Sequence, residues 1–284
     1  MSKITDVAIF LTASVVVFVI LFFAGFSIIN PSPDPENSPD IQNEMMTGIS
    51  DFQGYVQEGF YELNEIASSA AERISKTGLD GEGTEKILEE YMSKNPSIVT
   101  IGTFDGAGYV KAMVPVSHQE IVGKDLGNTP VVSLMNSRKV PLMTDQFDLA
   151  EGGKAASINY PVFTGDDRYA GFVSLTFDPA IMFGDILKKN FYQDEFQFMA
   201  VQKNGVILYD EDPEEIGKNT FKDPMYEDYP EISGFGEQFA EKWSGRYVYR
   251  FTDPGSLKEA KKEAFWTTCG IHGTEWRIMI IKTL

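Results

Sequence analysis

Two segments of the sequence repeat one pattern, and this repetition constrains the fold more than any single motif does. The first segment is DGAGYVKAMVPVSHQEIVGKDL, from residue 105, and the second is KNGVILYDEDPEEIGKNTF, from residue 203. Each contains a glycine turn inside a hairpin and then a polar loop that includes Gly-Lys-Asp or Gly-Lys-Asn. Repetition of a hairpin with its loop indicates that one small fold is used twice.

The residues around each hairpin predict the rest of that fold. Apolar and polar residues alternate with a period of two, which is typical of strands, and short helices interrupt the alternation. The expected fold class is α+β: a long N-terminal helix followed by two modules, each a roughly five-stranded antiparallel sheet with flanking helices. The predicted strands cover residues 98–104, 109–114, 140–144, 156–163 and 169–177 in the first module, and 196–202, 206–209, 246–251, 264–269 and 276–281 in the second.

No residue from position 7 to position 29 is charged, and this 23-residue run predicts one N-terminal transmembrane helix, so residues 1–29 form the expected anchor. At about 1.5 Å per residue the run reaches about 34 Å, more than the roughly 30 Å of a bilayer core. Lys3 precedes it, whereas Asp34 and Glu36 follow it. The positive-inside rule then predicts a single-pass cell-membrane protein with a cytoplasmic N-terminus and an extracytoplasmic C-terminal region. A cleaved signal peptide is the alternative.

Between the anchor and the first module, the sequence predicts a linker and two helices. Residues 30–43 contain four prolines among polar residues, which indicates a stiff, extended spacer. In residues 44–77, apolar side chains recur every three or four positions, as on one face of a long helix, and a second helix completes the region to residue 96. We expect the apolar stripe to face the core, with a lever or a dimer seam as the alternatives.

Composition and motifs exclude several function classes. The net charge of −18 would repel phosphate backbones, so nucleic acid is not an expected partner. Cys269 is the single cysteine, and with only His118 and His272 beside it no disulfide, Cys/His metal site or catalytic triad is expected. The sequence has no nucleophile elbow, Walker or dinucleotide-binding motif, and the acidic loop at residues 209–212 is expected to be solvated. We therefore expect no enzyme activity, no metal and no cofactor.

The order of these motifs resembles the double Cache family, the tandem PAS-like extracytoplasmic sensor regions of chemoreceptors and sensor kinases. The resemblance covers nearly the whole chain beyond residue 40. It implies a membrane-distal PAS-like module at residues 97–178, a connecting helix at 179–195 and a membrane-proximal module at 196–284. It also implies signal sensing, with a small-molecule ligand in the distal module. The segments that carry it are TIGTFDGAGYV with GKDL, KVPLMTDQF, SINYPVF, YAGFVSLTFDPAIM and FMAVQKNGVILYDEDPEEIGKN, besides the anchor and the long helix.

The resemblance further assigns candidate ligand contacts in the distal module. Alternation puts Phe172, Ser174 and Thr176 on one face of the last distal strand, where the family places its ligand contacts, whereas the residues between them face the core. Ordinary packing or solvent exposure is the alternative role for every candidate. The remaining candidates are Tyr109, Lys111, Arg138, Asp145 and the aromatic Phe147.

Two departures from the family pattern limit the class of ligand and the route of signalling that we expect. The amino-acid-binding subgroup carries Arg-x-Trp-Tyr after the GKDL-like loop and an Asp on the last distal strand, but this chain has GNTPVVSLMNSRK there and Thr176 at the Asp position. Because a buried α-amino acid needs partners for both of its charges, we expect a different ligand. The sequence reaches Leu284 without a cytoplasmic output domain, so signalling is expected to use a homodimer or a partner signalling protein. The alternatives are a surface interaction protein that acts through a receptor or kinase, and an extracytoplasmic hydrolase.

Overall fold

The computed structural model describes residues 39–149, 153–191, 196–227, 229–252 and 259–284. The predicted anchor helix at residues 7–29 lies outside the described residues, as does most of the predicted linker. Within the described ranges, no helix combines the length and the apolar character that a bilayer crossing requires.

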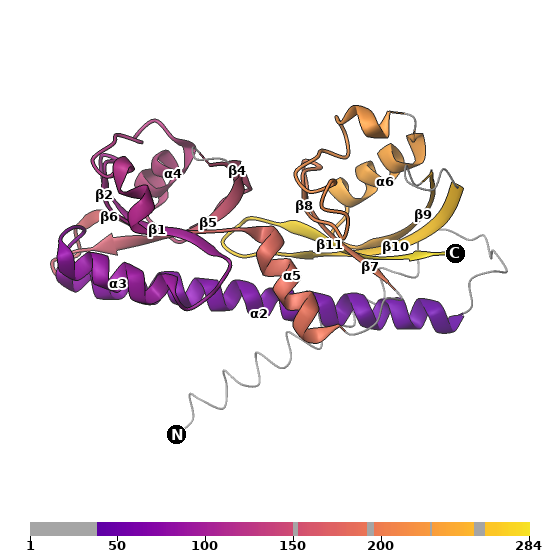
Figure 1. Cartoon of the computed structure of the whole chain (residues 1–284), viewed down its shortest axis with the longest axis horizontal. Helices are drawn as coiled ribbons and strands as arrows, with labels where there is room; N and C mark the ends of the chain where they lie inside the picture. Colours follow the sequence, from indigo (N-terminus) through magenta and orange to yellow (C-terminus); the bar gives the residue numbers. More distant parts are fainter. Residues whose placement is uncertain (1–38, 150–152, 192–195, 228, 253–258) are drawn as a thin grey trace, which may run out of the picture.

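The described chain contains α-helices, short 3₁₀ turns and two antiparallel sheets (Figure 1). The helices are α2 (Pro39–Thr77), α3 (Glu82–Met92), α4 (Pro130–Arg138), α5 (Pro179–Asn190) and α6 (Pro230–Glu241), and the 3₁₀ turns are η1 (Val116–Ile121) and η2 (Pro224–Tyr226). The first sheet contains β1 (Ile98–Asp105), β2 (Val110–Val114), β3 (Leu142–Met143), β4 (Phe147–Asp148), β5 (Lys154–Phe163) and β6 (Tyr169–Phe177). The second contains β7 (Gln197–Gln202), β8 (Ile207–Tyr209), β9 (Gly245–Thr252), β10 (Glu259–Cys269) and β11 (Trp276–Thr283).

The two sheets share one topology. The strand order is β2-β1-β6-β5-β3 in the first sheet, with β4 also paired to β5, and β8-β7-β11-β10-β9 in the second. The repeated hairpin thus forms the same edge of both sheets, and the last strand of each module lies in the centre. The first sheet has six strands, one more than predicted, because β4 adds a short pairing. We call the half that contains the first sheet the distal module and the half that contains the second sheet the proximal module.

Helix α2 is the element that joins the two modules, because it runs along one face of both sheets (Figure 1). Its 39 residues span about 58 Å. The predicted apolar stripe is buried along it and packs into one continuous core with both sheets, so this face is not free to form a dimer seam. The buried side chains are Met45, Ile49, Phe52, Val56, Phe60, Leu63, Ile66, Ala67, Ala70, Ala71 and Ile74.

The start of α2 differs from the prediction. The helix begins at Pro39, so residues 39–43 are helical and not part of an extended linker. A proline in the first helical turn loses no hydrogen bond, and Asp40 places a negative charge at the positive end of the helix dipole. Both effects favour a helix where the proline count had indicated a spacer.

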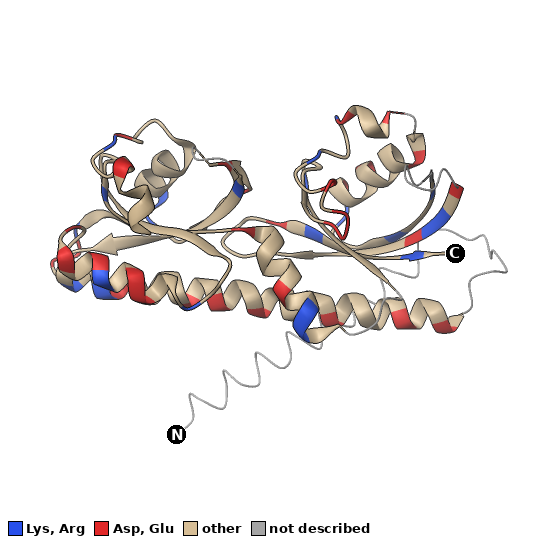
Figure 2. Ribbon diagram, viewed as in Figure 1, with Lys and Arg blue, Asp and Glu red and all other residues tan. Residues whose placement is uncertain are grey.

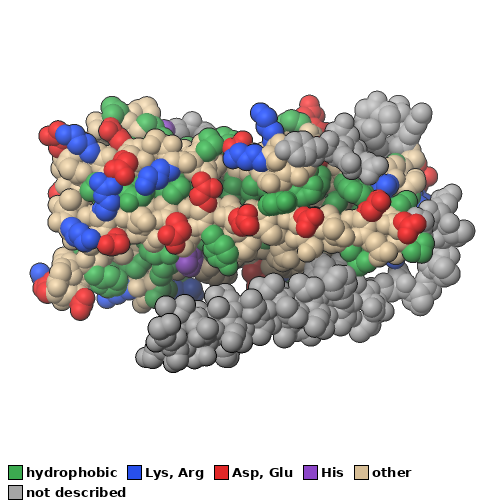
Figure 3. Space-filling view, turned by 90° about the horizontal axis from the view of Figure 1, so that it is seen from below, with side chains coloured by type: hydrophobic (Ala, Val, Ile, Leu, Met, Phe, Trp, Pro, Cys, Tyr) green, Lys and Arg blue, Asp and Glu red, His purple; other side chains and the backbone are tan. Residues whose placement is uncertain are grey.

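The faces of the sheets that α2 leaves open are covered by different helices. Figure 1 shows α4 above the distal sheet and α6 above the proximal sheet, on the side opposite α2. Acidic side chains are spread along helices α2 and α3, as Figure 2 shows in ribbon form and Figure 3 from below. Each module therefore has an α2-facing side, which forms the shared core, and a second side under its own short helix.

The turn between β10 and β11 of the proximal module contacts the distal module. The hydroxyl of Thr274 donates to the carbonyl oxygen of Met143 in β3 at 2.6 Å. Next to it, the Tyr160 hydroxyl donates to Asn64 Oδ1 at 2.9 Å, and His272 Nε2 lies 2.5 Å from the same oxygen. The junction thus links β3 and β5, helix α2 and the proximal sheet through side-chain hydrogen bonds.

Candidate functional site

The side chains of β6 alternate between two faces of the sheet, as predicted. Val173, Leu175 and Phe177 belong to the core shared with α2. Phe172 points the other way and packs in a separate apolar cluster with α4, where its ring stacks on that of Phe104 at 4.7 Å. Ser174 and Thr176 alternate with the core residues and therefore lie on the α4 side of the distal sheet.

The neighbouring strands add further polar side chains to this face. Thr176 is paired with Thr100 of β1 on one side and with Ser157 of β5 on the other, and Ser174 is paired with Asn159 of β5. Four of these five residues are buried, with Ser174 partly exposed. We call them the distal polar patch: Thr100, Ser157, Asn159, Ser174 and Thr176.

The carboxamide of Asn159 is the least satisfied group in the patch. Its Nδ2 donates to Ser157 Oγ at 2.9 Å and approaches the carbonyl oxygen of Leu142 at 3.4 Å. Its Oδ1 is buried without a hydrogen-bond partner, and the residue has no exposed surface. A buried acceptor without a donor costs about 1–3 kcal/mol, so Asn159 Oδ1 is the atom of the patch that a hydrogen-bond donor would stabilise most.

The structure places the other candidate residues outside the patch. Tyr109 precedes β2, is 43% exposed and bridges to Asp125, and Lys111 pairs with Asp80 in the α2–α3 connection at 3.2 Å. Arg138 is exposed at the end of α4, and Phe147 is 40% exposed in β4. Asp145 is exposed near the Trp276 indole, where partial desolvation raises its carboxyl pKa. In the described chain, no hydrogen bond or ion pair joins these five side chains to the patch.

Three members of the patch were not identified from the sequence. Ser157 and Asn159 flank Ile158, so the period of two in SINY places both on the face opposite the core. Thr100 lies two residues before Gly102, which is paired with Ser174. The alternation in β5 was therefore a usable signal, whereas the neighbours across the sheet required the strand register.

The proximal module contains a cavity of about 520 Å³ between α6 and its sheet. The acidic loop after β8 forms part of its wall: Glu211 and Asp212 are exposed, as the prediction of a solvated loop implies, whereas Asp210 is only partly exposed. Desolvation, followed by the nearby charge of Glu211, raises the pKa of Asp210 to about 6. Desolvation, followed by the charge of Asp210, raises the pKa of Glu215 to about 7. Among the described residues, no group of His, Cys, Asp and Glu is arranged to hold a metal ion.

These raised pKa values predict a pH-dependent stability. The ordinary pKa values are 3.8 for Asp210 and 4.5 for Glu215, so between about pH 4 and pH 7 the folded chain holds more protons than the unfolded chain. Their stabilising contribution is complete below about pH 4 and is lost as the pH rises through 6 to 7. The unfolding free energy of the native chain should fall between pH 4.5 and pH 7.5. In Asp210→Asn this fall should be smaller by on the order of 1 kcal/mol.

Urea unfolding at the two pH values measures this difference. Glu214→Gln is the matched control, because Glu214 lies in the same loop but is exposed and does not line the cavity. The control should keep the native pH dependence. Equal pH dependence in Asp210→Asn and the native chain would show that Asp210 is not desolvated.

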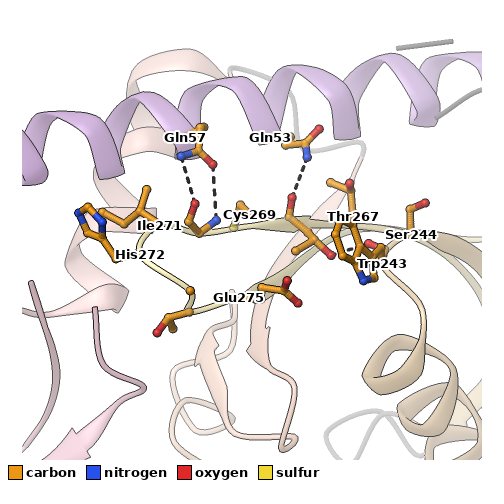
Figure 4. A pocket seen from close by; sticks show the side chains of 13 residues that line it. Gln53, Gln57, Trp243, Ser244, Thr267, Cys269, Ile271, His272 and Glu275 are labelled. Carbon is orange, nitrogen blue, oxygen red and sulfur yellow. Dashed lines mark hydrogen bonds between the residues drawn. The ribbon is translucent and has the colours of Figure 1, made fainter. Parts of the chain in front are cut away.

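A second hollow, of about 560 Å³, lies where α2 meets the edge of the proximal sheet (Figure 4). Strand β9 begins at Gly245, opposite Trp266, so the residues of β10 after Trp266 have no strand partner on that side. Gln53 Nε2 donates to the Thr268 carbonyl oxygen at 2.7 Å. The Gln57 carboxamide donates to the Gly270 carbonyl oxygen at 3.3 Å and accepts from its N–H at 3.5 Å. Helix α2 thus satisfies the sheet edge, which stabilises the packing of the helix on the sheet.

Comparison with known proteins shows which proteins this fold is similar to. Residues 58–179, from α2 through β6, match the family model of the HK/GC/chemotaxis protein-like sensor domain. The predicted resemblance is confirmed. The described residues have the fold of the Cache-type extracellular sensor domains of chemoreceptors and histidine kinases. A comparison with curated proteins gave no match.

Solved sensor structures match most of the chain at low sequence identity. An extracellular ligand-binding receptor from Desulfohalobium retbaense has a TM-score of 0.69 and 22% identity, over 84% of this chain and 40% of that receptor. The extracellular domain of a putative histidine kinase has a TM-score of 0.65 and 11% identity, over 86% of this chain and 95% of that domain. The ligand-binding domain of the Pseudomonas aeruginosa amino-acid chemoreceptor PctC, in complex with GABA, has a TM-score of 0.59 and 14% identity, over 85% and 99%.

Proposed function

We propose that this chain is a membrane-anchored extracytoplasmic sensor that binds a small polar molecule between the distal sheet and α4. The observation that carries the proposal is the distal polar patch, in which Asn159 Oδ1 is buried without a donor. The apolar cluster around Phe104 and Phe172 packs on the same face under α4, next to the patch, where the body of a ligand would lie in this proposal. Residues 7–29 supply the anchor in this proposal.

The chemistry of the patch favours a ligand without separate charges. The five side chains are hydroxyls and one carboxamide, which exchange hydrogen bonds with neutral donors and acceptors. The patch offers no cation for a carboxylate and no anion for an ammonium group, and burying either charge unpaired is costly. The PctC domain was solved with GABA, which carries both charges, so the proposal places this chain's ligand in a different chemical class.

A direct path leads from the patch to the proximal module. Asn159 Nδ2 approaches the carbonyl oxygen of Leu142, and the next residue, Met143, accepts a hydrogen bond from Thr274 in the β10–β11 turn. A ligand that reorients the Asn159 carboxamide therefore acts on β3, the strand that contacts the proximal module. In our proposal this contact shifts the balance between the free and the bound arrangement of the two modules.

The substitution Asn159→Leu tests the site. It removes the unpartnered acceptor and keeps a similar volume, so unfolding free energy should change by only about 1 kcal/mol, while ligand-induced stabilisation should be lost. Thermal unfolding of the full chain in mild detergent is measured against a set of small alcohols, amides, sugars and purines. Compounds that raise the Tm of the native chain should leave Asn159→Leu unchanged.

Ile158→Val is the matched control, because Ile158 directly precedes Asn159 in β5 and faces the shared core. It should lower the Tm slightly but keep the ligand-induced increase. If a ligand stabilises Asn159→Leu as much as the native chain, or if no compound in the set stabilises the native chain, the assignment of the distal polar patch is wrong.

A further inference from the structure

The proximal cavity occupies the position in its module that the distal polar patch occupies in the other. Both lie on the side of the sheet opposite α2, under the short helix of the module (Figure 1). The floor of the cavity comes from β7, β9, β10 and β11, and its roof from α6 and the loop after β8. The same topology therefore builds two faces of similar geometry, but different side chains line them.

Aromatic rings dominate the apolar wall of the cavity. Phe235 of α6 stacks on Tyr249 of β9, with ring centroids 5.3 Å apart. Phe239 packs edge-on against Phe235 at 5.4 Å. Faces and edges of several rings thus border one partly open cavity, and the negative faces of aromatic rings attract organic cations. The aromatic lining residues are Tyr226, Phe235, Phe239, Tyr249 and Phe251.

The polar wall of the cavity is strongly acidic. Four carboxylates line the cavity, and Lys262 is the only basic side chain among its described lining residues. The Lys262 ammonium already donates to Gln197 Oε1 at 2.9 Å and lies 5.4 Å from the centre of the Phe251 ring. The charge of Lys262 acts on Asp210 and that of Lys218 on Glu215, but the described lining holds more acidic than basic side chains. The carboxylates are those of Asp210, Glu211, Asp212 and Glu215.

A tyrosine hydroxyl that opens into the cavity marks the place where a ligand would sit. Tyr249 lines the cavity and is 8% exposed, and no hydrogen bond of its hydroxyl is found among the described residues. Tyr226, by contrast, donates its hydroxyl proton to Glu215. The charges of Asp210 and Glu215 act on the Tyr249 hydroxyl and help to raise its pKa, after desolvation, so phenol and carboxylates face the same space. An ammonium group in that space would donate hydrogen bonds to Asp210, Glu215 and the Tyr249 hydroxyl.

From this geometry we infer that the proximal cavity is a second ligand site, which binds a small primary ammonium ion with an apolar or aromatic body. The ammonium group lies at Asp210, Glu215 and the Tyr249 hydroxyl, and the body lies against Phe235 and the rings beside it. A cation at this position offsets the desolvated carboxylates and satisfies the free hydroxyl. This site differs from the distal polar patch in both place and ligand chemistry, so each can fail without the other.

Isothermal titration calorimetry on the full chain in mild detergent tests the inference. The probes are 2-phenylethylamine, the isosteric neutral 2-phenylethanol and the zwitterion phenylalanine, at a pH of about 8. We expect saturable binding of 2-phenylethylamine and at least about tenfold weaker binding of both other compounds, because one lacks the cation and the other adds a carboxylate to an acidic cavity. Comparable binding of phenylalanine would overturn the inference, since it would assign Lys262 to a ligand carboxylate.

Matched variants locate the binding. Asp210→Asn and Glu215→Gln should each weaken 2-phenylethylamine binding by about tenfold or more, whereas Glu214→Gln, in the same loop but outside the cavity, should change it less than twofold. Asn159→Leu should also leave it unchanged, which separates this site from the distal one. Near-ultraviolet circular dichroism confirms that each variant is folded. Absence of saturable amine binding, or equal losses in Glu214→Gln and Glu215→Gln, would overturn the assignment.

Discussion

Replacing Gly171 with alanine is expected to destabilise the distal module by at least about 3 kcal/mol. Gly171 lies in β6 with a φ of +151°, paired with Asp105 of β1 and Val162 of β5. A Cβ atom there would lie 1.9 Å from the carbonyl oxygen of Phe104 and 2.8 Å from the Cα of Asp105. Both contacts are with backbone, so relief requires β1 and β6 to separate. Strain at such a φ and the steric overlap each cost about 1–3 kcal/mol.

Urea unfolding followed by circular dichroism measures this loss. Gly165→Ala is the matched control, because Gly165 lies in the β5–β6 turn of the same module and a Cβ there meets no atom within 4 Å. It should stay within about 0.5 kcal/mol of the native chain. If Gly171→Ala lies within 1 kcal/mol of the native chain, the close approach of β1 and β6 described here is not present in solution.

Replacing Arg277 with alanine is expected to cost about 3 kcal/mol in the proximal module. The guanidinium is completely buried, and its Nε donates to the carbonyl oxygens of Phe239 at 2.8 Å and Lys242 at 3.2 Å, at the C-terminal end of α6. A cation there compensates the negative end of the helix dipole, and truncation also leaves a hole in the core. Burial lowers the pKa of Arg277, and Glu275, 3.7 Å from its Nη1, partly opposes that effect.

The size of the loss depends on which property of Arg277 matters. Arg277→Met keeps most of the volume and removes a charge whose two terminal nitrogens have no hydrogen-bond partner, so it should cost less than Arg277→Ala. Arg250→Ala is the surface control, because Arg250 forms exposed ion pairs with Glu231 and Glu259, and should cost at most about 1 kcal/mol. Equal unfolding free energies for Arg277→Ala and Arg250→Ala would contradict a structural role for the buried guanidinium.

Most of the secondary structure followed from local patterns. The apolar stripe on α2 is a property of spacing within one segment, and each of its predicted members is buried. The two glycine-turn hairpins likewise depend on neighbouring residues, and both formed β1–β2 and β7–β8 as predicted. Strand β10 begins at Glu259, five residues before the predicted start, because pairing with β9 and β11 stabilises a charged stretch that alternation alone did not identify.

The candidate site was only partly predictable. Alternation placed Ser174 and Thr176 on the face that bears the distal polar patch, because the face to which a side chain points depends only on its position within one strand. Lys111 was expected near them, but β1 and β2 slip in register between Thr103 and Phe104, and the Lys111 ammonium pairs with Asp80. A register shift depends on two strands at once, so no single-segment pattern reveals it.

The sequence by itself determined the fold class, the repeated topology and the alternation of faces, because each depends on the spacing of apolar residues and turns along a short stretch of chain. Only the tertiary structure decided which polar groups lose their water. Asn159 Oδ1 is buried without a donor on a sheet face that β5 forms together with β3 and β6, and Asp210 is desolvated because its loop lines a cavity with α6 and the strands beneath it. Burial of a polar atom results from segments far apart in the sequence, and this burial is what gives both candidate sites their chemistry.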